Sequence, residues 1–255
     1  MTSLNRLILS TAAAALLFTA PVQAADTKSS PFTAEQKAAL GTYIHDYLLE
    51  NPEVIIEAVN RYKTKEEEKQ NADAVGALDK YRDAIFKDKS MPQTGNLNGD
   101  VTIVEFFDFN CGYCQRAFDG INEAMAADKN LRFVFIDLPI LSPESKTASE
   151  WALAANKQGK YWEFHKAVMG FKGPKNAENL SDLAKKVGLD VPQLQKDAAS
   201  PEIKAQLEKH TEIAQALRIS GTPGFIVGDQ IIRGFIPYEG MKTIIADARK
   251  GTKTQ

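Results

Sequence analysis

Residues 101–114 have the sequence VTIVEFFDFNCGYC, and this stretch decides the fold that the chain is predicted to adopt. Residues 101–107 are almost wholly apolar on both faces, which is typical of a strand buried in a parallel sheet. Cys111 and Cys114 follow where the strand signal gives way to a helix that runs to about Asp128, and they are the only 2 cysteines of the chain. Two thiols three positions apart at such a junction can close and reopen a small disulfide ring. The sequence therefore predicts redox exchange.

The two cysteines are expected to have different roles. Cys111 falls at the helix N-terminus, where unpaired backbone N–H groups and the helix dipole stabilise an anion. This position should lower its pKa and make it the attacking thiolate. Cys114 lies one turn further into the helix and is expected to resolve the mixed disulfide. A CxxC pair alone is moderately specific, but between a buried strand and a helix it is a strong signal.

Glu105 is the one charged residue in the predicted strand. A carboxylate between Val104 and Phe106 in a strand buried on both faces should have a raised pKa. Because it lies six residues before Cys111, it is expected beneath the dithiol, where it can take the proton from Cys114. The alternative is an edge strand with Glu105 in solvent.

The third predicted element of the site is Thr222-Pro223, directly before a short predicted strand over residues 225–227. X–Pro bonds are seldom cis in folded proteins, so the dipeptide alone says little. Its placement after a helical region and before a hairpin favours a cis bond. A plain turn within residues 220–224 is the alternative.

Other uses of the two cysteines are less consistent with the sequence. A ring closed over two intervening residues constrains the unfolded chain very little, and a chain of this length can bury a core without a staple. A closed zinc site needs four ligands, whereas the CxxC supplies two and the histidines, His45, His165 and His210, are widely scattered. No metal site and no cofactor is predicted. The net charge of −2 and the lack of a large basic cluster argue against a nucleic-acid partner.

Residues 1–24 have the pattern of a signal peptide. Arg6 precedes an apolar run over residues 7–20, and Val22-Gln23-Ala24 ends in a small residue, so cleavage is expected after about Ala24. The apolar run is shorter than the roughly 20 residues that span a bilayer, which makes a retained anchor the weaker alternative. The mature protein is therefore expected to be exported to a compartment where disulfides persist.

Residues 25–90 are expected to form an N-terminal helical region. Thr33 and Gln36 have capping-box spacing, and apolar residues then recur at intervals of three and four. Asn51-Pro52 is expected to start a second helix that runs toward Lys87. The apolar stripe of this region either packs on the rest of its own chain or packs on other copies of the chain. The sequence alone leaves both possibilities open.

Residues 91–255 alternate strand and helix signals and are expected to form one α/β domain. Residues 92–100 have the composition of a linker or turn, and residues 142–217 are helical, with breaks at Gly173-Pro174, Gly188 and Pro192. The remaining predicted elements are strands over 131–137, 225–227 and 230–233, a hairpin turn at Gly228-Asp229, and a helix from Pro237 to near Gly251. A βαβ unit, a helical insertion and a ββα unit indicate a thioredoxin-like fold.

The chain resembles two known families. Phe106 to Cys114, the segment YWEFH at 161–165 and Thr222-Pro223 are similar to the DsbA-like branch of the thioredoxin superfamily, over residues 92–251. Residues 32–59, with the core YLLENPEV, resemble the N-terminal oligomerisation region of the suppressor-of-copper-sensitivity C (ScsC) proteins, which are periplasmic and trimeric in known examples. The resemblance implies a periplasmic protein and a homo-oligomer, with a trimer favoured.

The same resemblance implies a role for each candidate site residue. Cys111 is the nucleophile, Cys114 the resolving thiol and Glu105 the buried acid, while substrate contacts come from Gly112, Tyr113, Thr222 and Pro223. The implied partners are proteins with disulfides or free thiols and a membrane thiol–disulfide reductase of the DsbD or ScsB type.

The residues between the cysteines depart from DsbA itself. DsbA has Pro-His there, and its histidine stabilises the thiolate, whereas Gly112-Tyr113 supplies no cation. The same Gly-Tyr pair, with a threonine before the proline, resembles the disulfide isomerase DsbC. The resemblance thus favours an oligomeric disulfide isomerase or reductase. The alternatives are a monomeric DsbA-like oxidase and, in another class, a copper-binding or copper-tolerance protein whose two thiolates hold Cu(I).

Overall fold

The computed structural model describes residues 31–251 of the 255-residue chain. The expected signal peptide, residues 1–24, lies outside the described residues, as does the start of the expected N-terminal helical region. The chain divides into two compact units after Val59, and each unit is described by itself. Within residues 31–251 no helix has both the length and the apolar character needed to cross a bilayer.

The first unit contains α1 (Ala34–Glu50) and the first residues of α2 (Glu53–Phe86). The predicted capping box is confirmed: the backbone N–H of Gln36 donates to Thr33 Oγ1, and the backbone N–H of Thr33 donates to Gln36 Oε1. Asn51 caps the end of α1, and α2 begins at Glu53, directly after Pro52. No residue of α1 is buried, although apolar side chains follow one another along it: Leu40, Tyr43, Ile44 and Tyr47.

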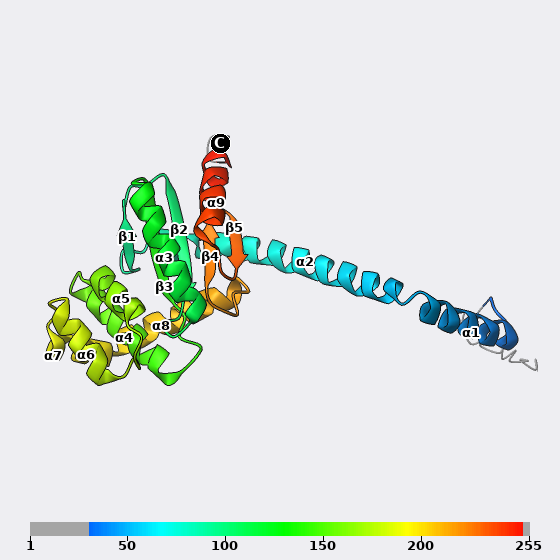
Figure 1. The fold of residues 1–255 in the computed structure, drawn as a ribbon, viewed down its shortest axis with the longest axis horizontal. Coiled ribbons are helices and arrows are strands. Elements are labelled where there is room, and N and C mark those ends of the chain that lie inside the picture. The colour runs from blue at the N-terminus through cyan, green and yellow to red at the C-terminus, as the bar shows by residue number, and fades with distance from the viewer. Residues whose placement is uncertain (1–30, 252–255) are drawn as a thin grey trace, which may run out of the picture. The chain divides into compact units, whose positions relative to one another are not determined.

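In the second unit, the strands among the described residues form one mixed sheet with the order β1-β3-β2-β4-β5 (Figure 1). The pairing of β2 with β3 is parallel and the other pairings are antiparallel. β2 is the central strand, which explains why its sequence is apolar on both faces. The bounds are β1 (Gln93–Gly95), β2 (Val101–Phe107), β3 (Leu131–Asp137), β4 (Gly224–Val227) and β5 (Gln230–Arg233).

The prediction of a linker or turn over residues 92–100 is wrong for β1, which pairs with β3 at the edge of the sheet. β1 has three residues and no apolar alternation, so its place comes from backbone pairing alone. Gly95 ends it with φ +81°, and a Cβ there would collide with the Leu131 carbonyl. In the sequence, a glycine at such a position is read as a sign of a turn. The short strand that ends at this glycine was therefore not predicted.

One face of the sheet packs against the second half of α2 and against α8 (Pro201–Ala216). Val104 and Phe106 point to this face, because alternate residues of a strand point the same way. Leu78 and Ile85 of α2 are fully buried against them. The expected boundary at residues 90 and 91 therefore falls after two core side chains of the domain. A segment that began at residue 91 would lack both.

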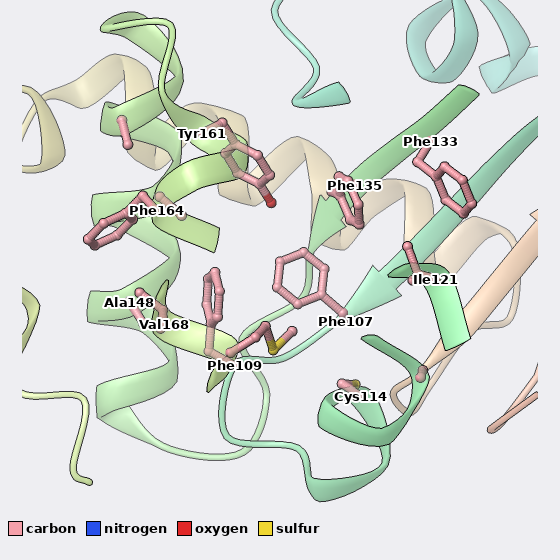
Figure 2. Close-up of a cluster of buried hydrophobic side chains, with 14 of the residues drawn as sticks. Phe107, Phe109, Cys114, Ile121, Phe133, Phe135, Ala148, Tyr161, Phe164 and Val168 are labelled. Carbon is pink, nitrogen blue, oxygen red and sulfur yellow. The ribbon is translucent and has the colours of Figure 1, made fainter. Parts of the chain in front are cut away.

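The other face packs against α3 (Gly112–Ala127), α9 (Tyr238–Gly251) and the helical insertion apart from α8. Figure 2 shows this core, with Phe107, Phe135 and Tyr161 from the sheet and the insertion and Cys114 at its edge. The insertion breaks near Gly173-Pro174 and Gly188 as predicted, but Pro192 lies in the first turn of a helix rather than at a break. Its helices are α4 (Pro143–Lys157), α5 (Tyr161–Gly170), α6 (Ala177–Lys186), α7 (Val191–Ala198) and α8.

Candidate active site

The loop that joins β2 to α3 is shaped by Asp108, which the sequence analysis did not single out. Its Oδ1 accepts the backbone N–H of Asn110 at 2.7 Å, and its Oδ2 accepts those of Ile140 at 2.9 Å and Leu141 at 3.0 Å. The backbone N–H of Cys111 donates to the Asp108 carbonyl at 3.0 Å. One buried carboxylate thus holds the cysteine loop and the loop after β3 in a fixed relation.

Cys111 is the N-cap residue of α3, with β-region dihedral angles and its thiol at the helix end. Its Sγ accepts the backbone N–H of Cys114 at 3.4 Å, and in the protonated form its S–H donates to the Thr222 carbonyl at 3.3 Å. Hydrogen bonding from the Cys114 thiol lowers the pKa of Cys111 most, Thr222 and the amides of Cys114 and Tyr113 add to the effect, and the value is about 5 despite partial burial. At neutral pH the Cys111 sulfur is therefore a thiolate.

Cys114 lies one turn further along α3 and is fully buried. Burial raises its pKa most, and the hydrogen bond to Cys111 and the charge of Glu105 raise it further. Cys114 therefore remains a thiol while Cys111 is an anion. Both cysteines are free in this structure, which thus represents the reduced state.

Glu105 is 1% exposed and lies in the middle of β2, opposite Phe135 of β3 and Phe225 of β4. The alternative of an edge strand with this residue in solvent is thus wrong. Burial raises the pKa of Glu105 well above its usual value, with a further contribution from the charge of Cys111. Neither carboxyl oxygen has a hydrogen-bond partner. The alternation of β2 directs Glu105 to the same face as α3, which carries the dithiol.

Thr222-Pro223 lies directly before β4, and its peptide bond is cis, as its placement predicted. The Thr222 carbonyl faces Cys111, and the Pro223 carbonyl accepts the backbone N–H of Gly234 at 2.9 Å. The structure thus brings this loop to the thiolate from the far end of the chain.

The residues between the cysteines are open to solvent. Gly112 is exposed, and a Cβ there would meet no atom within 4 Å, so packing does not require a glycine. Tyr113 is 54% exposed, and its ring lies against Phe235 and Arg116. Ile140 and Leu141 are also exposed, close to the cysteine loop through Asp108. Gly112 and Tyr113 were expected at the site, whereas the sequence pattern did not indicate Arg116, Phe235, Ile140 and Leu141, which come from α3 and from two loops.

Behind the dithiol, α5 buries polar side chains in an aromatic cluster. Both ring nitrogens of His165 lack a partner, and burial lowers its pKa to about 3, so the ring is neutral. Asp137 Oδ2 accepts the Tyr161 hydroxyl at 3.3 Å, and burial raises the pKa of Asp137 to about 8. Figure 2 places Tyr161 among the phenylalanines of this core. His165 is therefore a core residue of the insertion.

A parallel β2-β3 pair connected by α3, a dithiol at the N-terminus of α3 and a cis-proline loop beside it define a thioredoxin-like domain. The profile of the DSBA-like thioredoxin domain family matches residues 102–246, more than half of the chain. The chain belongs to this family. A second profile, the copper resistance protein ScsC N-terminal domain, matches residues 36–69.

Two solved structures show the extent of the similarity. A thioredoxin-like oxidoreductase from Silicibacter pomeroyi is 43% identical, with a TM-score of 0.64, over 66% of this chain and 98% of that one. A linker-deletion variant of Proteus mirabilis ScsC is 23% identical, with a TM-score of 0.66, over 88% of this chain and 99% of that one. At that identity the second likeness shows the fold alone.

Curated relatives include proteins of different length. Disulfide bond formation protein D of Bacillus subtilis is 28% identical over 64% of this chain and 79% of its own length. A Na(+)/H(+) antiporter NhaA of Salinispora arenicola is 29% identical over 62% of this chain but only 25% of its own length. The chain thus spans about a quarter of the length of the relatives of this second kind.

Proposed function

We propose that the chain is an exported thiol–disulfide oxidoreductase that works in the reduced state as an oligomeric disulfide isomerase or reductase. The observation that carries the proposal is the contrast between two neighbouring thiols. Cys111 has a pKa of about 5 and lies at a helix end, whereas Cys114 is fully buried and has a raised pKa. A dithiol with one anion and one protected thiol is suited to sequential disulfide exchange.

In the first step, the Cys111 thiolate attacks one sulfur of a substrate disulfide. A bond forms between Cys111 and that sulfur, the substrate S–S bond breaks, and the other substrate sulfur leaves as a thiolate. Thr222 and Pro223 would support the substrate backbone, because the Thr222 carbonyl of this loop contacts the Cys111 sulfur. Gly112 and Tyr113 would contact the substrate, since both are exposed beside the nucleophile.

In the second step, the mixed disulfide has two fates. Another substrate thiolate can attack it, which forms a new substrate disulfide and restores Cys111 with no net transfer of electrons. Alternatively, Cys114 attacks Cys111, the substrate leaves fully reduced, and the protein keeps the disulfide. The second route transfers two electrons to the substrate.

Glu105 would accept the proton of Cys114 in the second route. The charge of Cys111 contributes to the raised pKa of both Glu105 and Cys114. That charge disappears when Cys111 enters the mixed disulfide, so both pKa values fall at the moment when Cys114 must lose its proton. Glu105 then ionises more readily and serves as the base.

A reductase that ends each cycle oxidised needs an electron donor. A membrane thiol–disulfide reductase of the DsbD or ScsB type would return two electrons by exchange with the Cys111–Cys114 disulfide. A reductase in the membrane could reach this protein if the protein is exported, as residues 1–24 predict. The predicted export supports a periplasmic location.

Assembly through the N-terminal region supports the isomerase over a monomeric oxidase. α1 has no buried residue and exposes Leu40, Tyr43, Ile44 and Tyr47, a pattern that favours packing against other copies. The match to the ScsC N-terminal domain covers the same region. The resemblance to the ScsC proteins favours a trimer. Several dithiols around one substrate raise the local thiol concentration, which reshuffling of bonds requires.

Refolding of a scrambled multi-disulfide protein tests this proposal. The reduced protein should accelerate recovery of the native substrate, and the oxidised protein should not. An oxidised form that instead introduces disulfides into a reduced substrate, with a strongly oxidising reduction potential, would favour the DsbA-like oxidase.

A copper-binding role is the second candidate, because the profile matched at residues 36–69 is that of a copper resistance protein. The two sulfurs of Cys111 and Cys114 suit Cu(I), a soft ion. Among the described residues no group of three His, Cys, Asp or Glu side chains is placed to hold a metal ion. Stoichiometric copper binding that survives a competing chelator, without disulfide exchange, would favour this candidate.

A further inference from the structure

Arg116 lies on α3 two residues after Cys114 and points its guanidinium at two aromatic rings. The guanidinium carbon is 4.1 Å from the centroid of the Tyr113 ring and 5.7 Å from that of Phe235. The two rings lie 6.1 Å apart, tilted by 46°. Contact with ring faces orients an arginine while leaving its N–H groups open to another partner.

No carboxylate within residues 31–251 forms an ion pair with Arg116, and its contacts are the two rings. Other arginines of the same domain do pair: Arg82 with Asp229 at 2.6 Å, and Arg249 with Asp100 at 2.7 Å. Arg116 is thus exposed and oriented by the two rings, and it has no anionic partner in the part of the chain that the structure describes.

The position of Arg116 places it beside the path of a bound substrate. Tyr113 lies between the two cysteines, and Phe235 follows Gly234, whose backbone N–H donates to the Pro223 carbonyl at 2.9 Å. The contact between the Tyr113 and Phe235 rings therefore connects the cysteine loop to the cis-proline loop. A polypeptide held in a mixed disulfide with Cys111 and supported by Thr222-Pro223 would pass this cluster.

Arg116 and Lys172 are exposed cationic side chains close to the first turns of α3, which carry the dithiol. Glu105 and Asp108 are both buried, so neither presents a negative charge at the surface. Lys172 reaches the same helix turn, where its Nζ donates to Gln115 Oε1 at 3.2 Å. An acidic side chain would meet attraction here and a basic one repulsion.

We infer that Arg116 binds a carboxylate of the substrate, so that the site prefers polypeptides with an Asp or Glu close to the reactive cysteine. The inference rests on the proposed function and adds a substrate preference to it. A guanidinium can bind a carboxylate through two parallel hydrogen bonds, which the ammonium of lysine cannot reproduce. The pKa of Cys111 is lowered by Cys114, Thr222 and helix amides, so a substitution of Arg116 should change recognition and leave the thiolate intact.

Three peptides of one sequence test the preference. Each has a single cysteine in a disulfide with the neutral thiol 2-mercaptoethanol, and the residue two positions before the cysteine is Glu, Gln or Lys. The rate constant for attack by the reduced full chain is measured at low and at moderate ionic strength. Each value is divided by the rate with a small neutral thiol, which removes the intrinsic reactivity of the peptide.

The wild type should react about threefold faster with the Glu peptide than with the Gln peptide, as an exposed ion pair of typical strength would give. This preference should shrink as salt is added. Arg116→Gln should remove it, Arg116→Lys should keep part of it, and Arg116→Glu should reverse it in favour of the Lys peptide. Lys129→Glu is the matched control, because it makes the same charge change about 20 Å away at the other end of α3.

Equal Glu-to-Lys ratios in the wild type and in Arg116→Glu would overturn the inference. A shift in Lys129→Glu as large as that in Arg116→Glu would also overturn it, since overall charge would then be the cause. The proposed function itself would be contradicted if the wild-type protein attacked the Gln peptide no faster than the small neutral thiol attacks the same peptide. The inference would then fall with that function.

Discussion

At the scale of single residues, Cys111 and Cys114 differ through the positions that α3 gives them. The N-cap position supplies hydrogen bonds to the sulfur of Cys111, and the next turn buries Cys114 beneath it. Glu105 adds a buried carboxyl whose proton affinity depends on the charge of Cys111. The three groups form one coupled unit, so the protonation of each changes during the reaction.

Glu105→Gln should leave attack by Cys111 within about twofold of the wild-type rate. It should slow resolution by Cys114 roughly a hundredfold, the lower range of general-base contributions. Stopped-flow fluorescence of the reduced protein with a peptide disulfide separates the two phases. Glu123→Gln, an exposed position on α3, is the matched control. Unchanged resolution in Glu105→Gln would remove the base from the mechanism.

At the scale of secondary-structure elements, the second half of α2 belongs to the core of the catalytic unit. Leu78 and Ile85 are fully buried against Val104 and Phe106 of the central strand. Polar contacts add to this packing: the Tyr81 hydroxyl donates to Glu212 Oε1 at 2.7 Å, and Arg82 pairs with Asp229. α2 is therefore more than a connector, because it covers one face of the sheet.

Leu78→Ala should lower the free energy of unfolding by about 2–5 kcal/mol, since a fully buried leucine would leave a cavity. Urea unfolding of the full chain measures the change. Val75→Ala on the same helix is the control and should cost less than about 1 kcal/mol, because Val75 is 39% exposed. A Leu78→Ala protein as stable as Val75→Ala would show that α2 does not pack on the sheet in solution.

The main strands could be predicted to the residue because their sequences are simple. β2 and β3 are mainly apolar runs, in which Thr102, Glu105 and Arg132 are the internal polar residues, and the predicted ranges of 101–107 and 131–137 match the structure. β1 could not be predicted, because three residues without apolar alternation are placed only by pairing with β3. The packing of α2 on the sheet could not be predicted either, because an apolar stripe indicates that a helix face is buried but not which surface covers it.

The candidate site divides in the same way. Cys111, Cys114, Glu105 and the Thr222-Pro223 loop could be identified from spacing and resemblance, and the structure brings them together. The sequence did not allow us to identify Asp108, Arg116 and Phe235 as site residues, because their contacts depend on segments that are far apart in sequence. One signal for Asp108 was present: a second carboxylate within the apolar run that precedes the cysteines.

At the scale of the whole molecule, the proposed function gives each of the two units its own role: disulfide exchange in one and assembly in the other. The dithiol lies in the second unit, and the first unit exposes apolar side chains along α1, a helix none of whose residues is buried. Since exposed apolar surface of this kind favours association, we expect the first unit to assemble copies of the chain.

Ile44→Asp combined with Tyr47→Asp should therefore reduce the mass measured by light scattering to that of a monomer. Reaction with a small peptide disulfide should be unchanged, whereas recovery of a scrambled substrate should fall several-fold. Lys37→Asp, at a polar position on the same helix, is the control and should change neither the mass of the assembly nor the recovery of the scrambled substrate. A wild-type chain that is already monomeric would contradict the assembly role and favour the oxidase.

The central claim is that Cys111 is a thiolate nucleophile and Cys114 a buried, protonated partner. It is tested by the rate at which the reduced protein reacts with iodoacetamide from pH 3 to pH 9, with the modified residue identified by mass spectrometry. Because the anion is the reactive form, the rate at Cys111 should rise through pH 5, follow one titration and be level from about pH 7. Cys114 should remain unmodified throughout. A rate at Cys111 that rises only near pH 9, or equal modification of both cysteines, would contradict the account.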